Sequence, residues 1–220
     1  MSNIVTIGFI TEGTTDVRFL GQIIRRTFEI VAFDCQGEIE VYEPEHIKSH
    51  GEFIDEVFRA SQDAHKIGMN VLCIHTDADS NSDKHVIEHK INPAFENVAN
   101  SENTSLCKNL VAVIPIQMTE AWMLADKDVL KNQIDTVLTD QDLEIHRQPE
   151  NYADPKAAIE NAIRISRRDL PRRRRYEFEI SELYQIIGQT ADLKKLAQLH
   201  SYQKFKNGVV EAFKKLGYLH

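Results

Sequence analysis

Four short apolar runs, separated by helical patterns, constrain the fold of this chain most strongly. The runs at 70–76 and 110–117 are almost continuously apolar, which is typical of strands buried on both faces of a parallel sheet. The run at 4–10 is rich in β-branched residues, and the alternation at 38–43 predicts a half-exposed or edge strand. Strands that alternate with helices predict an α/β fold with a mostly parallel four-stranded sheet flanked by helices.

Helical patterns lie between these runs and dominate the last third of the chain. Residues 51–67 place apolar side chains on one stripe, and a further helix is expected at about 83–99. Later helices are expected at 154–166, 179–188, 190–199 and 203–216. We therefore expect an α/β domain over residues 1–145 and a helical C-terminal extension over residues 146–220, attached as a cap rather than as an independent domain.

The charge is divided unevenly along the chain. The net charge is −8, but residues 1–150 hold 12 Lys/Arg against 26 Asp/Glu, a net of −14. Residues 151–220 hold 14 against 8, a net of +6. An acidic body followed by a basic segment indicates a partner that carries phosphate groups.

The most basic stretch contains four consecutive arginines, Arg172, Arg173, Arg174 and Arg175. Guanidinium groups bind phosphates through two parallel hydrogen bonds, so this stretch is a candidate contact for a nucleic-acid backbone. The alternative is an exposed loop or helix face that pairs with the acidic body.

Several classes of protein are excluded. No run approaches the roughly 18 apolar residues of a membrane helix, and the N-terminus has no basic region before its apolar stretch, so we expect no membrane partner. The three cysteines are widely spaced and form no C-x-x-C pair, which predicts free thiols and a cytoplasmic location. The phosphate-binding loop of ATPases is absent, so the chain is not expected to hydrolyse ATP itself.

Acidic residues follow three of the predicted strands. Glu12 comes after the first strand, Asp77 and Asp79 come directly after the third, and Glu120 opens the helix after the fourth. Because ligands collect at the carboxyl ends of parallel strands, we expect these four carboxylates to meet at one edge of the sheet. They would repel one another unless a cation lay between them, and hard oxygen ligands suit Mg²⁺ or Mn²⁺ acting on a phosphoester.

Two of these acids have simpler explanations. Glu12 is also explained as a solvated turn residue, and Glu120 as a first-turn residue stabilised by the helix dipole after a Thr119 cap. The pair Asp77 and Asp79 is less ordinary, because their alternation puts both carboxylates on one side of the chain.

Two short motifs resemble the Toprim domain, which topoisomerases, primases and OLD-family nucleases share. They are Glu12-Gly13 after one strand and Asp77-Ala78-Asp79 after another. Further runs resemble a narrower group of stand-alone Toprim-like proteins that are often encoded beside an ATPase in microbial defence-type operons. These runs are Val113–Asp126, Asp154-Pro155-Lys156 and Tyr202-Gln203-Lys204-Phe205.

The resemblance implies that Glu12, Asp77 and Asp79 bind the metal and that Glu120 adds a further carboxylate ligand. It also implies an assisting lysine, for which Lys84 and Lys156 are the candidates. We therefore expect a nuclease that depends on Mg²⁺ or Mn²⁺, cleaves DNA or RNA, and serves as the effector of a two-component anti-phage defence system with an ATPase. No active-site tyrosine of the topoisomerase kind is assignable and no zinc module is present, which disfavours topoisomerase and primase activities.

Three alternatives remain open. Phosphatases of the haloacid dehalogenase class use a D-x-D motif, but after their first strand. Nucleotide-sugar transferases use a D-x-D motif with a metal, but are larger and need no Glu-Gly pair. The third alternative is a non-catalytic regulatory or interaction subunit of a partner ATPase.

Overall fold

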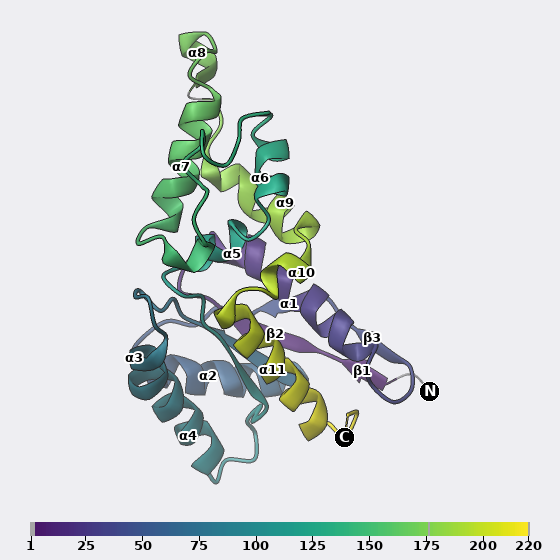
Figure 1. Ribbon diagram of the computed structural model, residues 1–220. Helices are drawn as coiled ribbons and strands as arrows, with labels where there is room; N and C mark the ends of the chain where they lie inside the picture. The colour runs from purple at the N-terminus through teal and green to yellow at the C-terminus, as the bar shows by residue number, and fades with distance from the viewer. Residues whose placement is uncertain (1–2, 176, 220) are drawn as a thin grey trace.

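The computed structural model of the protein describes residues 3–175 and 177–219. The strands are β1 (Asn3–Val5), β2 (Ile7–Ile10), β3 (Ile39–Val41), β4 (Glu45–His46), β5 (Val71–His75) and β6 (Leu110–Val113). The α-helices are α1 (Asp16–Ala32), α2 (Phe53–Lys66), α3 (Lys84–Val86), α4 (Asn92–Asn100), α5 (Thr119–Met123), α6 (Lys127–Gln133), α7 (Pro155–Ser166), α8 (Arg172–Arg175), α9 (Leu183–Thr190), α10 (Leu193–Leu196) and α11 (His200–Lys215). A π-helical turn, η1 (Ile87–Ile91), joins α3 to α4, and short 3₁₀ turns lie at η2 (Pro149–Asn151) and η3 (Ile180–Glu182). Parallel strands flanked by helices confirm the predicted α/β class (Figure 1).

Four strands form one parallel sheet in the order β4-β2-β5-β6. The pairing of β2 with β5 runs to Ile10 opposite Ile74, and the pairing of β5 with β6 runs to His75 opposite Val113. These three strands therefore end at the same edge of the sheet, and the polar segments that follow them are brought together there.

The first apolar run forms two strands rather than one. β1 pairs with β3 in a separate two-stranded sheet, and β2 enters the main sheet. Thr6 lies between β1 and β2. Its backbone N–H donates to Asn70 Oδ1 (2.9 Å), and its hydroxyl donates to the Gly68 carbonyl (2.8 Å). The strand predicted at 38–43 is β3, so it lies outside the main sheet. The fourth strand of that sheet is β4, which at two residues is too short to leave an apolar run in the sequence.

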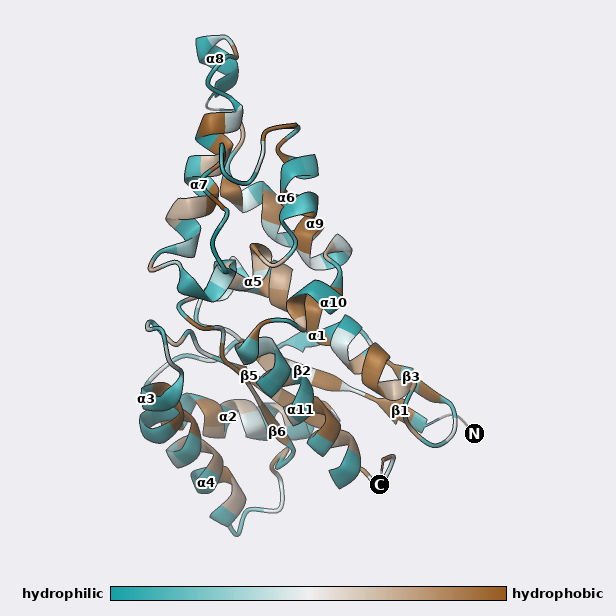
Figure 2. Cartoon of the chain, in the orientation of Figure 1, coloured by the Kyte–Doolittle hydropathy of each residue, from teal (hydrophilic) through white to brown (hydrophobic). Residues whose placement is uncertain are grey.

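Side chains of β2 and β5 alternate between two cores on opposite faces of the sheet. Phe9 and Cys73 join a cluster with α1, α5, α9 and α11, whereas Ile10 and Ile74 join a cluster with α2 and α4. The central strands are accordingly buried along their whole length, and apolar except at His75, the last residue of β5 (Figure 2). Strands buried on both faces are continuously apolar, which is why the sequence predicts them well.

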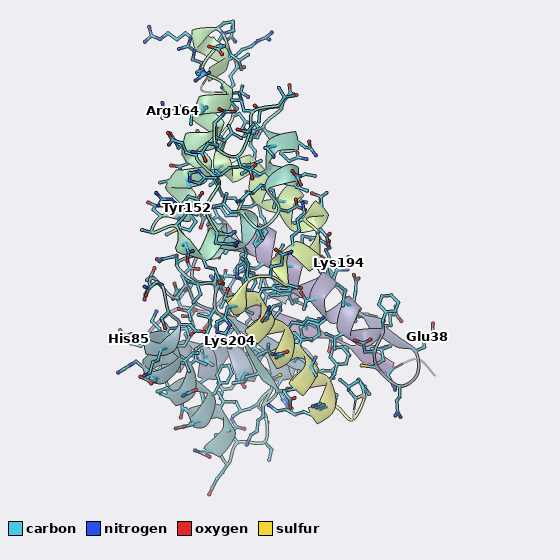
Figure 3. All side chains as sticks on the ribbon, viewed as in Figure 1. Glu38, His85, Tyr152, Arg164, Lys194 and Lys204 are labelled. Carbon is cyan, nitrogen blue, oxygen red and sulfur yellow. The ribbon has the colours of Figure 1, made fainter. Side chains whose placement is uncertain are left out.

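An arm built from α6, α7 and α9 extends from the sheet and ends at α8 (Figure 1). α5, the helix that follows β6, contacts α7 and α9 at the base of this arm. Figure 3 labels Arg164 far along the arm and Lys204 on α11 beside the sheet. The arm therefore begins at the edge where the parallel strands end.

α9 packs closely along α1. A Cβ atom at Gly188 would lie 2.9 Å from the carbonyl oxygen of Phe19, closer than real Cβ atoms approach, so this crossing requires glycine. The close approach matters for the site, because it holds Tyr184, one turn before Gly188, against the start of α1.

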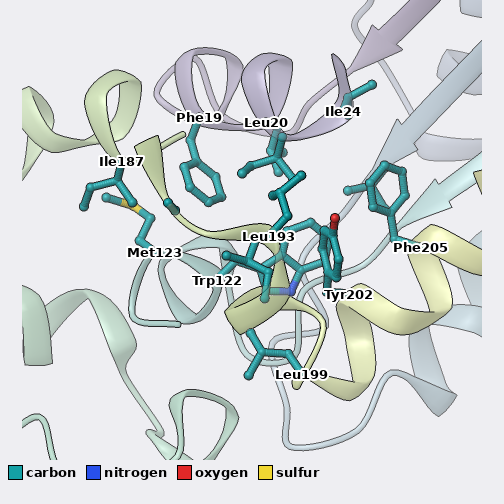
Figure 4. Close-up of a cluster of buried hydrophobic side chains, with 14 of the residues drawn as sticks. Phe19, Leu20, Ile24, Trp122, Met123, Ile187, Leu193, Leu199, Tyr202 and Phe205 are labelled. Atoms are coloured by element: carbon teal, nitrogen blue, oxygen red, sulfur yellow. The ribbon is translucent and has the colours of Figure 1, made fainter. Parts of the chain in front are cut away.

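The helices beyond residue 145 share the core of the sheet. Trp122 of α5 packs with Tyr202 and Phe205 of α11, at ring-centroid distances of 5.4 and 5.9 Å (Figure 4). The Trp122 indole N–H donates to Ser201 Oγ at 2.7 Å. α11 also contacts β6 directly, so the C-terminal helices are packed on the sheet. Among the described helices, none has the length and apolar character that spanning a bilayer requires.

Candidate functional site

Five carboxylates gather where β2, β5 and β6 end, and we call this group the carboxylate edge. Glu12 follows β2, Asp77 and Asp79 follow β5, and Asp16 and Glu120 lie in the first turns of α1 and α5. The register of the three strands places them at one end of the sheet. The structure thus brings the four acids marked in the sequence to one edge and adds Asp16.

Glu12 is held by Thr76 and Lys90. Its Oε1 accepts hydrogen bonds from Thr76 Oγ1 at 2.5 Å and from Lys90 Nζ at 3.1 Å, and Lys90 Nζ also donates to Thr76 Oγ1 at 3.2 Å. Burial acts to raise the pKa of Glu12, but these hydrogen bonds and the charge of Lys90 outweigh it and lower that pKa below its usual value. Glu12 is therefore ionised at neutral pH, with the lysine as its counter-charge.

Lys90 lies in the π-helical turn η1. The sequence predicts one helix at about 83–99, and the segment is helical, but it contains this wider turn. π turns inside α-helices are rare and frequently occur at functional sites. The sequence gives no sign of Lys90, because a lysine on an amphipathic helix is ordinarily a solvated surface residue.

Among the described residues, neither lysine marked in the sequence makes an ion pair with an acid of the carboxylate edge. Lys84 is exposed in α3 and pairs loosely with Glu88 at 3.9 Å. Lys156 is exposed in the first turn of α7. Among the lysines and arginines of residues 3–175 and 177–219, only Lys90 makes an ion pair with an acid of the carboxylate edge, so Lys90 is the lysine that the structure places beside these acids.

His75, the last residue of β5, is buried beside Asp77. Its Nε2 lies 3.2 Å from both Asp77 Oδ1 and Thr119 Oγ1. Burial disfavours the protonated ring, but the hydrogen bond and charge of Asp77, with the charges of Asp16 and Glu12, outweigh it and raise the pKa of His75 above its usual value. The Nδ1 atom of His75 is also buried and has no hydrogen-bond partner among the described residues.

Thr119 holds Asp77 rather than capping a helix. The sequence predicts it as an N-cap, but Thr119 is the first residue of α5, and the residue before the helix is Met118. The Thr119 backbone N–H donates to Asp77 Oδ1 at 2.9 Å. One oxygen of Asp77 is therefore fixed by the start of α5, which follows the neighbouring strand β6.

Asp16 and Glu120 lie deeper than the other acids, at 8% and 6% exposure. The Tyr184 hydroxyl donates a hydrogen bond to Glu120 Oε1. Burial, and after it the negative charges of Asp77 and Glu120, raise the pKa of Asp16 to about 6 despite the opposing charge of His75. The sequence analysis did not select Asp16 as a ligand, because an acid in the first turn of a helix is ordinarily explained by the helix dipole.

Asp79 lies on the exposed side of the edge, at a strained turn. Its φ is +49°, that of Gln117 is +64°, and the Asp79 N–H donates to the Gln117 carbonyl at 2.9 Å. Such left-handed conformations cost on the order of 1–3 kcal/mol at non-glycine residues. Burial, followed by the negative charges of Asp77 and Glu12, raises the pKa of Asp79 above its usual value. Asp79 therefore lies close enough to Asp77 and Glu12 for their charges to act on it.

The donor chemistry of the carboxylate edge suits a hard divalent cation. Glu12, Asp77 and Asp79 offer oxygen ligands, which Mg²⁺ and Mn²⁺ prefer, and a cation would offset their repulsion. In the part of the chain that the structure describes, no three His, Cys, Asp or Glu side chains form a preformed metal site. Glu12 instead faces Lys90, and Asp77 faces Thr119. The Oε1 atom of Glu12 is therefore already hydrogen-bonded by Thr76 and Lys90.

The four arginines marked in the sequence are not part of this edge. Arg172, Arg173, Arg174 and Arg175 form α8, and all four are exposed. α8 lies at the end of the arm farthest from the sheet (Figure 1). The structure therefore separates the candidate phosphate-binding residues from the candidate metal ligands.

No protein-family model, no curated protein and no solved structure matches this chain significantly.

Proposed function

We propose that this protein is a nuclease that hydrolyses phosphodiester bonds with Mg²⁺ or Mn²⁺. The observation that carries the proposal is the convergence of Glu12, Asp77 and Asp79 with Lys90 where the parallel strands end. Neighbouring carboxylates repel one another, and a bound cation reduces this repulsion. A lysine beside them adds a group that binds phosphate. A cation site next to a phosphate-binding group is the arrangement that phosphodiester hydrolysis requires.

Each residue of the edge has a role in this proposal. Glu12, Asp77 and Asp79 hold the cation, which when bound polarises the phosphate and lowers the pKa of a water molecule. Lys90, released from Glu12, binds a phosphate oxygen and offsets the negative charge that develops in the transition state.

Other residues keep the ligands in position. Metal-binding carboxylates work best when hydrogen bonds fix their orientation. His75 and Thr119 provide these bonds for Asp77. Glu120, which the resemblance implied as a ligand, is a positioning residue here: its hydrogen bond with Tyr184 anchors the start of α5, where Thr119 lies.

The proposal is tested by incubating the purified protein with duplex DNA, single-stranded DNA and RNA in Mn²⁺, in Mg²⁺ and in EDTA. We expect cleavage of at least one of these nucleic acids in metal and none in EDTA. The assay is repeated with any ATPase encoded beside the gene. If no nucleic acid is cleaved in either metal, alone or with that ATPase, the proposal is wrong.

Replacement of Lys90 is expected to separate metal binding from catalysis. In Lys90→Met, Mn²⁺ should bind roughly five- to tenfold more tightly, because a half-exposed positive charge a few ångströms from Glu12 opposes the cation by about 1 kcal/mol. Cleavage should become slower, since the phosphate loses its lysine. Calorimetric titration with Mn²⁺ and single-turnover cleavage rates measure the two effects.

The matched control is Lys84→Met, which removes an exposed lysine from the same helical segment. It should change neither the affinity for Mn²⁺ nor the rate. An unchanged affinity in Lys90→Met would show that Glu12 does not bind the metal.

A further inference from the structure

The tip of the arm is a concentrated positive surface. Residues 164–175, which we call the arginine tip, contain seven arginines, no lysine and one acid, Asp169. The α8 part of the tip is hydrophilic throughout (Figure 2). The sequence placed part of this charge in one run, and the structure shows that the run is presented at the end of a projecting arm (Figure 1).

Some of these arginines build the tip. Arg175 Nε donates to the Leu170 carbonyl at 2.7 Å. Arg167 donates from Nε and Nη2 to the Arg174 carbonyl at 3.1 and 2.6 Å, and its guanidinium lies 5.5 Å from the centre of the Phe178 ring. Arg167 and Arg175 therefore close the loop that carries α8.

The remaining arginines of α8 are available to a partner. Among the described residues, the side chains of Arg172 and Arg174 make no hydrogen bond and no ion pair, and Arg173 has only an exposed contact with Glu177 at 3.5 Å. The guanidinium groups of Arg172, Arg173 and Arg174 are thus exposed on a loop that the hydrogen bonds of Arg167 and Arg175 close.

The composition of the tip favours a phosphate backbone over a protein surface. Protein interfaces have an apolar or aromatic centre, but the large apolar residues that are exposed in the described chain lie outside 164–175. Arginines without such a centre match phosphate groups, which they bind through paired hydrogen bonds.

The length of the arm sets how far the tip lies from the carboxylate edge. α7, which runs along the arm, has 12 residues and therefore spans about 18 Å. One base step of duplex DNA covers about 3.4 Å, so about five steps fit along α7 alone. A nucleic acid shorter than this would reach the carboxylate edge or the tip, but not both.

We infer that the arginine tip binds the phosphate backbone of the substrate at a distance from the carboxylate edge, so that the protein acts on long polynucleotides in preference to short ones. The inference rests on the proposed function, because that function supplies a nucleic acid at the carboxylate edge. The tip recognises phosphate groups and not base sequence.

The first experiment measures binding alone. Fluorescence anisotropy in EDTA compares the wild type with the triple variant Arg172→Gln, Arg173→Gln and Arg174→Gln, on duplex DNA, single-stranded DNA and RNA. We expect the affinity for a duplex of about 30 base pairs to fall roughly tenfold or more, and the slope of log K against log salt to decrease by about 2–3, as the loss of three phosphate contacts requires. Arg167 and Arg175 stay in place, so the loop keeps its fold.

A matched control removes three exposed lysines elsewhere, Lys66→Gln, Lys194→Gln and Lys215→Gln. It changes the net charge equally and should bind nucleic acid like the wild type. Equal loss in both variants would overturn the inference, because the effect would then come from net charge.

The second experiment measures length. Cleavage of a long duplex by the triple variant should slow in proportion to its weaker binding, whereas hydrolysis of bis(p-nitrophenyl) phosphate, which cannot reach the tip, should be unchanged. If the triple variant binds and cleaves long nucleic acid like the wild type, the inference is overturned. This holds also if the triple variant has lost binding to a protein partner. Failure of the proposed function looks different: the wild type then binds polynucleotides through the tip but cleaves nothing in metal.

Discussion

Asp77→Asn is expected to reduce metal-dependent cleavage roughly 10²–10³-fold, the loss seen when a group that stabilises transition-state charge is removed. Asparagine keeps the shape of the side chain and a carbonyl oxygen that still accepts from the Thr119 N–H. It removes the negative charge that the cation needs. Cleavage rates at saturating Mn²⁺ measure the loss, and thermal unfolding followed by circular dichroism shows whether the fold is intact.

The control for this prediction is Asp63→Asn, which removes an exposed aspartate paired with Lys66 at the end of α2. It should retain full activity. Wild-type cleavage by a folded Asp77→Asn protein would remove Asp77 from the metal site and leave Asp79 as the proposed ligand that follows β5.

The main features of the sheet and part of the candidate site follow from the sequence, because buried apolar strands are followed within two residues by charged side chains. β5 is buried at every residue and leads directly into Asp77 and Asp79. A strand of this kind must be central, and in a parallel sheet its carboxyl end must lie beside those of its neighbours. The position of Glu12 beside the D-x-D segment therefore needed no knowledge of side-chain contacts.

Other parts of the site depend on packing that leaves no local trace. Lys90 reaches Glu12 from a π-helical turn 78 residues away in the chain. Tyr184 reaches Glu120 because Gly188 lets α9 approach α1. Lys156 stays a prediction: its side chain is exposed in the first turn of α7, beside the buried Pro155, and the sequence alone does not say where that turn lies relative to the carboxylate edge.

Asp16→Asn is expected to stabilise the protein at neutral pH by about 3 kcal/mol, the free energy that corresponds to a pKa raised from 3.8 to about 6. Burial is the main cause of this shift, followed on the raising side by the charges of Asp77 and Glu120. Asparagine has nearly the same shape and carries no charge, so the folded state no longer holds an ionised group in this position.

The effect should depend on pH in a defined direction. Below pH 3.8 the carboxyl group is protonated in both the folded and the unfolded chain, and the substitution should change stability little. Between pH 3.8 and about 6 the folded protein keeps the proton while the unfolded chain has lost it, so wild-type stability falls as the pH rises through this window. Above pH 6 Asp16 is ionised in both the folded and the unfolded chain, and the folded protein is destabilised by the full free energy of holding that charge.

Urea unfolding of the wild type and of Asp16→Asn at several pH values measures this difference. A stability gain that is the same at pH 4 as at neutral pH would show that the charge of Asp16 is not its cause. Asp63→Asn, which removes the half-exposed partner of Lys66 at the end of α2, is the control and should not stabilise the protein.

Thermal unfolding with and without Mn²⁺ is an independent check of the free energy that the ionised Asp16 costs the folded state. A cation held at the carboxylate edge offsets the negative charge around Asp16, so Mn²⁺ should raise the unfolding temperature of the wild type more than that of Asp16→Asn. The carboxylate edge would then be a region that lowers stability while it lacks its cation, as binding sites frequently do. Equal stabilisation of the two proteins by Mn²⁺ would place the cation away from Asp16, and with it away from Asp77.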